Sequence, residues 1–115
     1  MTTDSSPLNE AQALARERLV LLCQKMLNGE LSFVEGAIQA FSLRANVGVP
    51  ESDPDLLSFV AIVSETDHLP ASHVQQHWSS EALQRLQPEF EEAEVWAKGV
   101  ASEPCKNIIA RFSTQ

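Results

Sequence analysis

Hydrophobic residues recur at helical spacing over most of this chain. Between Leu8 and Leu27 they fall three or four positions apart, and residues at that spacing share one face of an α-helix. The stripe comprises Leu8, Ala11, Ala15, Leu19, Leu22 and Met26. Ser6 suits the N-cap and Pro7 the first helical position, and Asn28-Gly29 is typical of a helix end. The pattern therefore predicts a first helix ending near Leu27.

A second helix is predicted from a capping signal. Ser32 and Glu35 have the spacing of a capping box, in which each residue satisfies a backbone amide of the other. The helix should run over 33–45, and its predicted buried face consists of Val34, Ala37, Ile38, Phe41 and Ala45. Gly36 in its first turn either lets another helix approach closely or is a tolerated weak point.

Asp53 and Pro54 mark the start of a third helix, because an acidic N-cap followed by proline at the first helical position is a favoured combination. The helix should cover 54–64. Its residues are apolar nearly all round, which predicts a central helix covered on several sides. The β-branched run 59–63 would also suit a buried strand, but no partner strand is found, so helix is preferred.

The remaining chain predicts a loop, a short helix and one long helix. Pro70 disfavours helical geometry at the residue before it, so 65–70 should be a loop. Ser72 suits the cap of a short helix reaching Trp78. Helical spacing then continues from 79 to 112, with Pro88 and Pro104 expected to kink the last helix or restart it.

These elements predict an all-α fold, a compact bundle of four main helices plus a short one, with the last helix long and kinked. The 115 residues are one domain's worth. We expect a single helical domain over 7–115, preceded by a disordered tail over 1–6. The apolar third helix and the long last helix are also compatible with a homodimer.

The formal net charge is −8, from 16 acidic against 8 basic residues. Nucleic acids and anionic membranes require a basic surface, so neither is an expected partner. An acidic face instead suits a basic protein partner, although excess acid also simply keeps a small protein in solution. Charge thus favours protein binding over nucleic-acid or membrane binding.

Cys23 and Cys105 each lie in an apolar helical pattern, far from any metal-binding spacing. We expect two buried thiols, since a secreted disulfide scaffold would carry more cysteines. The polar N-terminus has neither the basic nor the apolar part of a signal peptide, and no apolar run reaches membrane-spanning length. A cytoplasmic location is therefore expected, with no cofactor.

The richest candidate chemistry lies in one short segment. All three histidines, His68, His73 and His77, fall within ten residues. His73 and His77 are spaced to share a helix face, and His68, Asp67 or Glu65 would complete a metal shell. Metal binding or a metal-dependent activity through the three histidines is therefore one hypothesis, although the glutamate of an HExxH site is absent.

The same segment admits two other interpretations. Acid–base catalysis would use Glu65, Asp67 and His68, but no nucleophile motif surrounds them, so an enzyme is the less favoured class. Recognition of a protein partner would use Trp78 as an anchor beside charged residues. Trp78 also suits the core. The acidic run Glu89, Glu91, Glu92 and Glu94 is expected to be a solvated helix face.

The string S-E-T-D-H-L-P over 64–70, followed by His77-Trp78, resembles a family of small bacterial proteins of unknown function. The closing segment C-K-N-I-I-A-R-F over 105–112 is similar as well. This resemblance implies no established activity. In size and acidity such proteins are similar, by analogy of class, to immunity proteins that neutralise toxins.

Our leading hypothesis is a small acidic protein-binding module, an immunity-like inhibitor or an adaptor. Its predicted binding residues are Glu65, Asp67, His68, His73, His77 and Trp78. In this hypothesis Glu65 and Asp67 accept hydrogen bonds from basic groups of the partner, and the histidines make the contact sensitive to pH. Metal binding through His68, His73 and His77 is the alternative.

Overall fold

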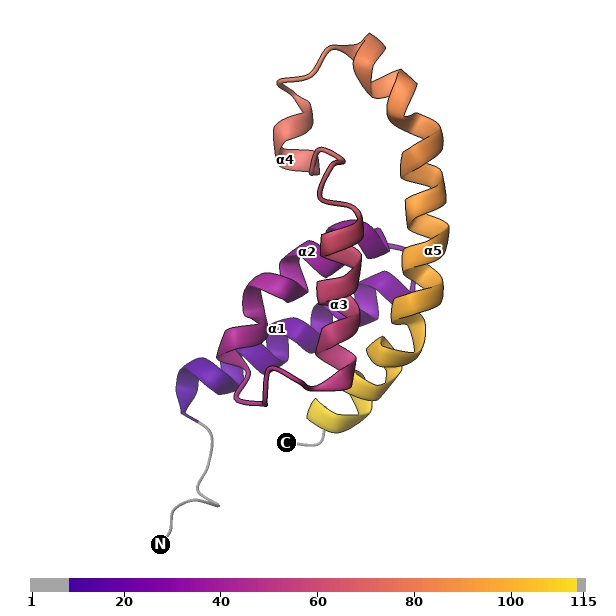
Figure 1. Cartoon of the computed structure of the whole chain (residues 1–115). Helices are drawn as coiled ribbons and strands as arrows, with labels where there is room; N and C mark the ends of the chain where they lie inside the picture. Colours follow the sequence, from indigo (N-terminus) through magenta and orange to yellow (C-terminus); the bar gives the residue numbers. More distant parts are fainter. Residues whose placement is uncertain (1–8, 114–115) are drawn as a thin grey trace, which may run out of the picture.

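The computed structural model describes residues 9–113, apart from the side chains of Ser72 and His73. Over that range the chain is helical and contains no strand (Figure 1). In order, the elements are α1 (Glu10–Leu27), α2 (Phe33–Leu43), the 3-10 turn η1 (Arg44–Asn46), α3 (Pro54–Glu65), α4 (Ser72–Gln75) and α5 (Ser80–Phe112). The all-α prediction, with a long last helix, is confirmed.

Side-chain caps start most of these helices. Ser32 accepts a hydrogen bond from the amide of Glu35, and Asp53 caps α3 in the same way, as predicted. The predicted start of α1 is wrong: the helix begins at Glu10, where Asn9 and Gln12 form a capping box. Asparagine is as good an N-cap as serine, and Ser6, Pro7 and the rest of the predicted tail lie outside the described residues.

Two predicted helix lengths need correction. α2 stops at Leu43 and tightens into η1, two residues before the predicted end. α4 covers only Ser72–Gln75, with Ala71 rather than Ser72 at its N-cap position. α5, by contrast, runs unbroken from its cap at Ser79 through Pro88 and Pro104, and Figure 1 shows it bending along its course. The prolines therefore bend this helix and do not restart it.

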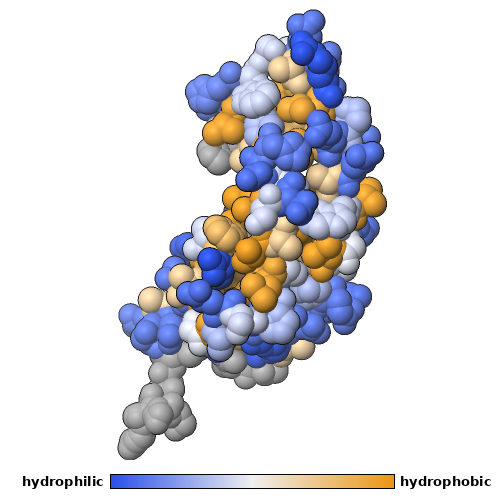
Figure 2. Space-filling view, in the orientation of Figure 1, coloured by the Kyte–Doolittle hydropathy of each residue, from blue (hydrophilic) through white to orange (hydrophobic). Residues whose placement is uncertain are grey.

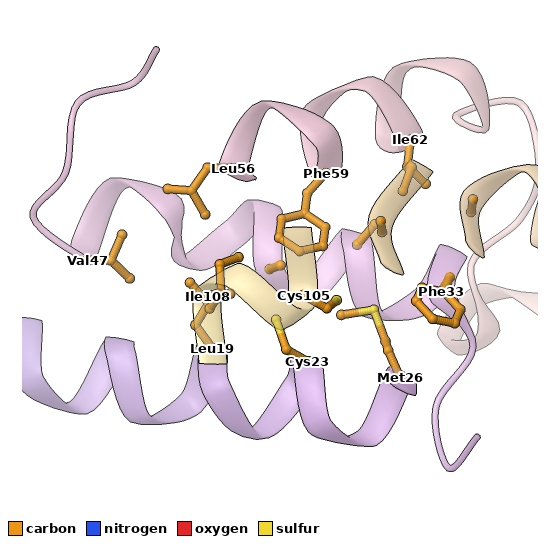
Figure 3. Close-up of a cluster of buried hydrophobic side chains, with 14 of the residues drawn as sticks. Leu19, Cys23, Met26, Phe33, Val47, Leu56, Phe59, Ile62, Cys105 and Ile108 are labelled. Atoms are coloured by element: carbon orange, nitrogen blue, oxygen red, sulfur yellow. The ribbon is translucent and has the colours of Figure 1, made fainter. Parts of the chain in front are cut away.

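The core lies where α1, α2, α3 and the second half of α5 meet (Figure 3). Its largest fully buried side chains are Phe59, Leu19, Met26, Ile62, Ile108, Val47, Cys23 and Cys105. Full burial of a large aliphatic or aromatic side chain contributes roughly 1.5–3 kcal/mol. In α5 every buried residue lies from Ala97 onward, so only the C-terminal half of this helix belongs to the core.

The buried faces of α2 and α3 differ from the predicted ones. Ala37 is buried as predicted, but Val34, Ile38 and Phe41 are only half-buried and Ala45 is exposed. The face of α2 in the core is centred on Phe33, Gly36, Ala37 and Ala40. Gly36 contributes to this difference: a Cβ there would overlap the buried Met26 side chain, so α2 packs tightly against α1 at this glycine.

α3 is not a central helix. It buries Leu56, Phe59 and Ile62 on one face, whereas Leu57 and Ala61 are exposed. α3 therefore has more apolar residues than its contacts within one chain bury.

The C-terminal end of α5 is tied to the start of α3 by ion pairs. Arg111 lies 2.9 Å from carboxylate oxygens of both Asp53 and Asp55. Burial alone raises the pKa of Asp53. The hydrogen bonds from Arg111 and from the Leu56 amide outweigh that effect, so the pKa lies below its usual value. These carboxylates thus serve both the N-terminus of α3 and its attachment to α5.

The first half of α5 extends beyond the bundle. Together with the loop after α3 and with α4, it forms a projection over residues 67–90, called the arm below (Figure 1). The molecule measures 60 × 26 × 24 Å, elongated for a chain of this length. The arm carries most of the segment in which the sequence predicts the functional site.

Candidate functional site

The loop that leaves α3 is anchored by two buried residues and exposes the charged ones between them. The Thr66 hydroxyl donates a hydrogen bond to the Ile62 carbonyl at 2.7 Å, and the Leu69 amide donates to the Thr66 carbonyl at 3.0 Å. Glu65, Asp67 and His68 are exposed. Thr66 and Leu69 thus hold the loop in place, while its ionisable groups are exposed to solvent.

His68 reaches from this loop to α5. Its Nε2 lies 3.1 Å from Oε2 of Glu89, and both side chains are about half exposed. A shallow pocket of about 310 Å³ surrounds the pair, and Glu65, Glu92 and Trp96 also line it. Two of the predicted residues, Glu65 and His68, are thus brought together with three from α5.

The other predicted residues lie elsewhere. His77 and Trp78 follow α4 and are exposed on the arm, and neither lines the pocket of His68. The side chain of His73 lies outside the described residues. The predicted site is therefore spread from the end of α3 along the arm, because the short α4 separates its first residues from its last.

The metal hypothesis depends in part on His73, whose side chain lies outside the described residues. Within the part of the chain that the structure describes, no three histidine, cysteine or carboxylate side chains are grouped as a metal site. His68 contacts Glu89 instead.

A second pocket was not predicted from the sequence. It is a groove of about 470 Å³ where the arm meets α2, called the arm groove below. Its apolar lining consists of Leu31, Val34, Ile38, Leu69, Pro70, Ala71 and Phe90. Figure 2 shows hydrophobic surface at the notch between the arm and the bundle, continuing over this face of the bundle. The half-buried Val34 and Ile38, predicted as core, are in fact walls of this groove.

The charges of the arm groove all have one sign. Four carboxylates line it, from Glu30, Glu35, Glu91 and Glu94, and no lysine or arginine is among its lining residues. Glu94 is already engaged: its two oxygens accept hydrogen bonds of 2.6 and 3.1 Å from the amides of Phe33 and Val34. Glu30 and Glu91 are exposed and give the groove an acidic rim.

The groove wall on the arm side is held by a polar contact. Gln75 of α4 donates a hydrogen bond from Nε2 to the Pro70 carbonyl at 3.1 Å. One sequence signal could have indicated this wall of the groove: Pro70 and Phe90 are apolar residues in a segment otherwise rich in polar ones. No local pattern in the sequence predicts that α2 lies opposite these two residues.

None of the helices described here is long and apolar enough to cross a membrane. Comparisons with protein-family models, with curated proteins and with solved structures find no match to this chain.

Proposed function

We propose that this protein is a binding module that takes up a basic segment of a partner protein in the arm groove. One observation carries the proposal. An apolar groove with Val34, Ile38 and Phe90 in its walls is rimmed by carboxylates, and no lysine or arginine lines it among the residues that the structure describes. An apolar pocket with a single sign of charge at its rim selects a ligand that combines an apolar anchor with the opposite charge.

The size of the groove limits the kind of ligand. A volume of about 470 Å³ suits a few side chains and does not suit a folded domain. The partner would therefore insert a short segment, with one or two large apolar side chains against Phe90 and Ile38. Lysines or arginines beside that anchor would lie near Glu30 and Glu91, which are both exposed. The anchor would supply most of the affinity, and the rim charges would supply orientation and association rate.

The residues singled out by the sequence extend this surface in the proposal. Glu65 and Asp67 add two exposed carboxylates next to the loop that forms the groove wall. Trp78 is exposed on the same arm and would serve as an outlying anchor. An immunity-like inhibitor or an adaptor in the cytoplasm, acting on a basic partner, is the concrete form of this function.

A peptide-display selection on the full chain tests the proposal. Peptides selected by the wild-type protein should pair Lys or Arg with a Leu, Phe or Trp anchor. Their affinity should fall at least tenfold or so on the Glu30→Lys, Glu91→Lys double variant, since two attractions become repulsions. Phe90→Ala should weaken the same peptides without changing their preference for basic residues.

The control is a double variant with the same change of charge at a distance, Glu17→Lys with Glu51→Lys. Both residues are exposed and neither lines the groove. Selected peptides that lack basic residues, or that bind the two double variants equally, would contradict the proposal. If binding is lost only in the Trp78→Ala variant, the binding surface lies on the outer part of the arm and not in the arm groove.

A further inference from the structure

α1 presents an outward stripe in which leucines alternate with cations. Leu14, Arg18, Leu21 and Lys25 are spaced four, three and four residues apart, so they lie on one side of the helix. All four are exposed, and the two leucines keep 50% and 51% of their surface in solvent. Among residues 9–113, neither cation has an ion pair. The stripe is therefore apolar and basic without a partner in this fold.

The stripe borders a groove between α1 and α2. Leu22 and Leu43 line this groove of about 300 Å³ beside Arg18, Leu21 and Lys25. An amphipathic helix laid along α1 would cover both the stripe and the edge of the groove.

α5 carries a stripe of the opposite charge. Glu92, Val95, Gly99 and Glu103 are spaced three, four and four residues apart, and all are exposed. Val95 keeps 74% of its surface in solvent, the most of any large hydrophobic residue described. Neither glutamate takes part in an ion pair within the described range. Lys106 begins the next turn, so the acidic stretch ends at Glu103.

Gly99 gives this stripe a second feature. It lies in the middle of α5, where glycine weakens a helix relative to alanine. A Cβ at Gly99 would meet no atom within 4 Å, so no packing inside the chain requires a glycine here. A missing side chain on an exposed helix face lets another helix approach closely. Next to the exposed Val95, it forms a shallow seat for a large apolar side chain.

We propose that these two stripes bind each other between two copies of this chain, α1 of one copy against α5 of the next. The chain itself carries the acidic, apolar counterpart of its basic, apolar stripe, and each extends over about three turns of helix. Leu14 or Leu21 would pack at Val95 and Gly99, while Arg18 and Lys25 would face Glu92 and Glu103. Because the two surfaces differ, they can pair reciprocally in a two-fold dimer or join copies head to tail.

This contact is separate from the arm groove. None of the eight residues in the two stripes lines that groove. A failure of self-association would therefore leave the proposed function standing, and the reverse also holds.

Sedimentation velocity on the full chain tests the proposal, from micromolar to millimolar concentration at low salt. The wild-type protein should sediment faster as its concentration rises. The variant Arg18→Glu with Lys25→Glu carries two acidic stripes, and Glu92→Lys with Glu103→Lys carries two basic ones. Each alone should associate at least tenfold or so more weakly. An equimolar mixture of the two should associate again, because each variant then meets its complement.

Gly99→Ala is the second variant, since it fills the seat while favouring the helix. It should weaken self-association with the circular dichroism signal retained. A wild-type chain that stays monomeric at millimolar concentration would overturn the proposal. So would variants that associate as the wild type does, or a mixture that associates no better than its components. Should a double variant fail to fold, Lys25→Glu and Glu92→Lys replace it in the same mixing experiment.

Discussion

Glu94 caps a helix that begins 61 residues before it: its Oε2 accepts a hydrogen bond of 2.6 Å from the backbone amide of Phe33. Its other oxygen accepts from Val34 at 3.1 Å. A carboxylate at a helix N-terminus satisfies otherwise unpaired amides and interacts favourably with the helix dipole. This contact joins α2 to α5 near the point where the arm leaves the bundle, and Glu94 lines the arm groove there.

Glu94→Ala should lower the free energy of unfolding by roughly 1–2 kcal/mol, because two amides lose their acceptor and the cap interaction is lost. Urea denaturation followed by circular dichroism measures this loss. Glu91→Ala, three residues away and exposed, is the matched control and should change stability by less than about 0.5 kcal/mol. Equal effects from the two variants would show that the Glu94 contact contributes nothing in solution.

Arg111→Met should destabilise the fold by roughly 2 kcal/mol, since it leaves Asp53 and Asp55 without their cation at the start of α3. The loss is smaller than for a fully buried pair because 36% of the Arg111 side chain is exposed. Chemical denaturation at neutral pH measures it. Lys106→Met removes an exposed cation from the same helix and should be nearly neutral.

The same ion pair predicts how stability depends on pH. The pKa of Asp53 is lowered in the fold, so its contribution is present above the ordinary aspartate pKa of about 3.9 and is lost as pH falls through the folded value. The urea midpoint of the wild type should therefore drop in that acidic range. The drop should be smaller in Arg111→Met, where the main cause of the lowered pKa is gone. Parallel pH profiles for the two proteins would contradict this assignment.

One substitution at two glycines should have opposite effects. Gly36→Ala forces a Cβ into the buried Met26 side chain and should cost about 1–3 kcal/mol. Gly99→Ala meets open space in mid-helix and should stabilise the monomer by about 0.5–1 kcal/mol. Thermal unfolding at low concentration compares the two. Destabilisation by Gly99→Ala under those conditions would mean that its neighbourhood is more crowded than the structure has it.

Cys23 should resist thiol reagents in the native protein. The hydrogen bond with the Cys105 thiol and the burial of both side chains raise the pKa of Cys23, which disfavours the reactive thiolate (Figure 3). Labelling by a thiol reagent should follow global unfolding as urea is added. Because the folded pKa is raised, this group's contribution to stability is lost as pH rises beyond about 8.5, where the unfolded thiol ionises. Rapid labelling in native buffer would contradict the account.

The sequence predicted those features that depend on neighbouring residues. Caps at Ser32 and Asp53, the helix starts that follow them and the all-helical class are local, because capping side chains bond amides only three residues ahead. Two buried cysteines were predicted from apolar patterning and are found. Periodicity was enough for these features.

Features that depend on which helices meet were not predictable. Val34 and Ile38 fit a core stripe, yet they line the arm groove, and Gly36 takes the close contact with Met26 of α1. Glu94 fit a solvated acidic face, but it caps a distant helix. Of the predicted site residues, Glu65 and His68 share a pocket, whereas Trp78 lies apart because α4 intervenes. Each of these outcomes is set by tertiary contacts far apart in sequence.

The most direct test of the central claim is an NMR titration of the labelled full chain with a short basic peptide that carries one aromatic anchor. The account predicts shift changes concentrated at Val34, Ile38, Pro70-flanking amides and Phe90, weakening at higher salt and absent from the Glu30→Lys, Glu91→Lys variant. A matched acidic peptide should cause none of them. Shift changes scattered over the surface, or equal for both peptides, would contradict binding in the arm groove.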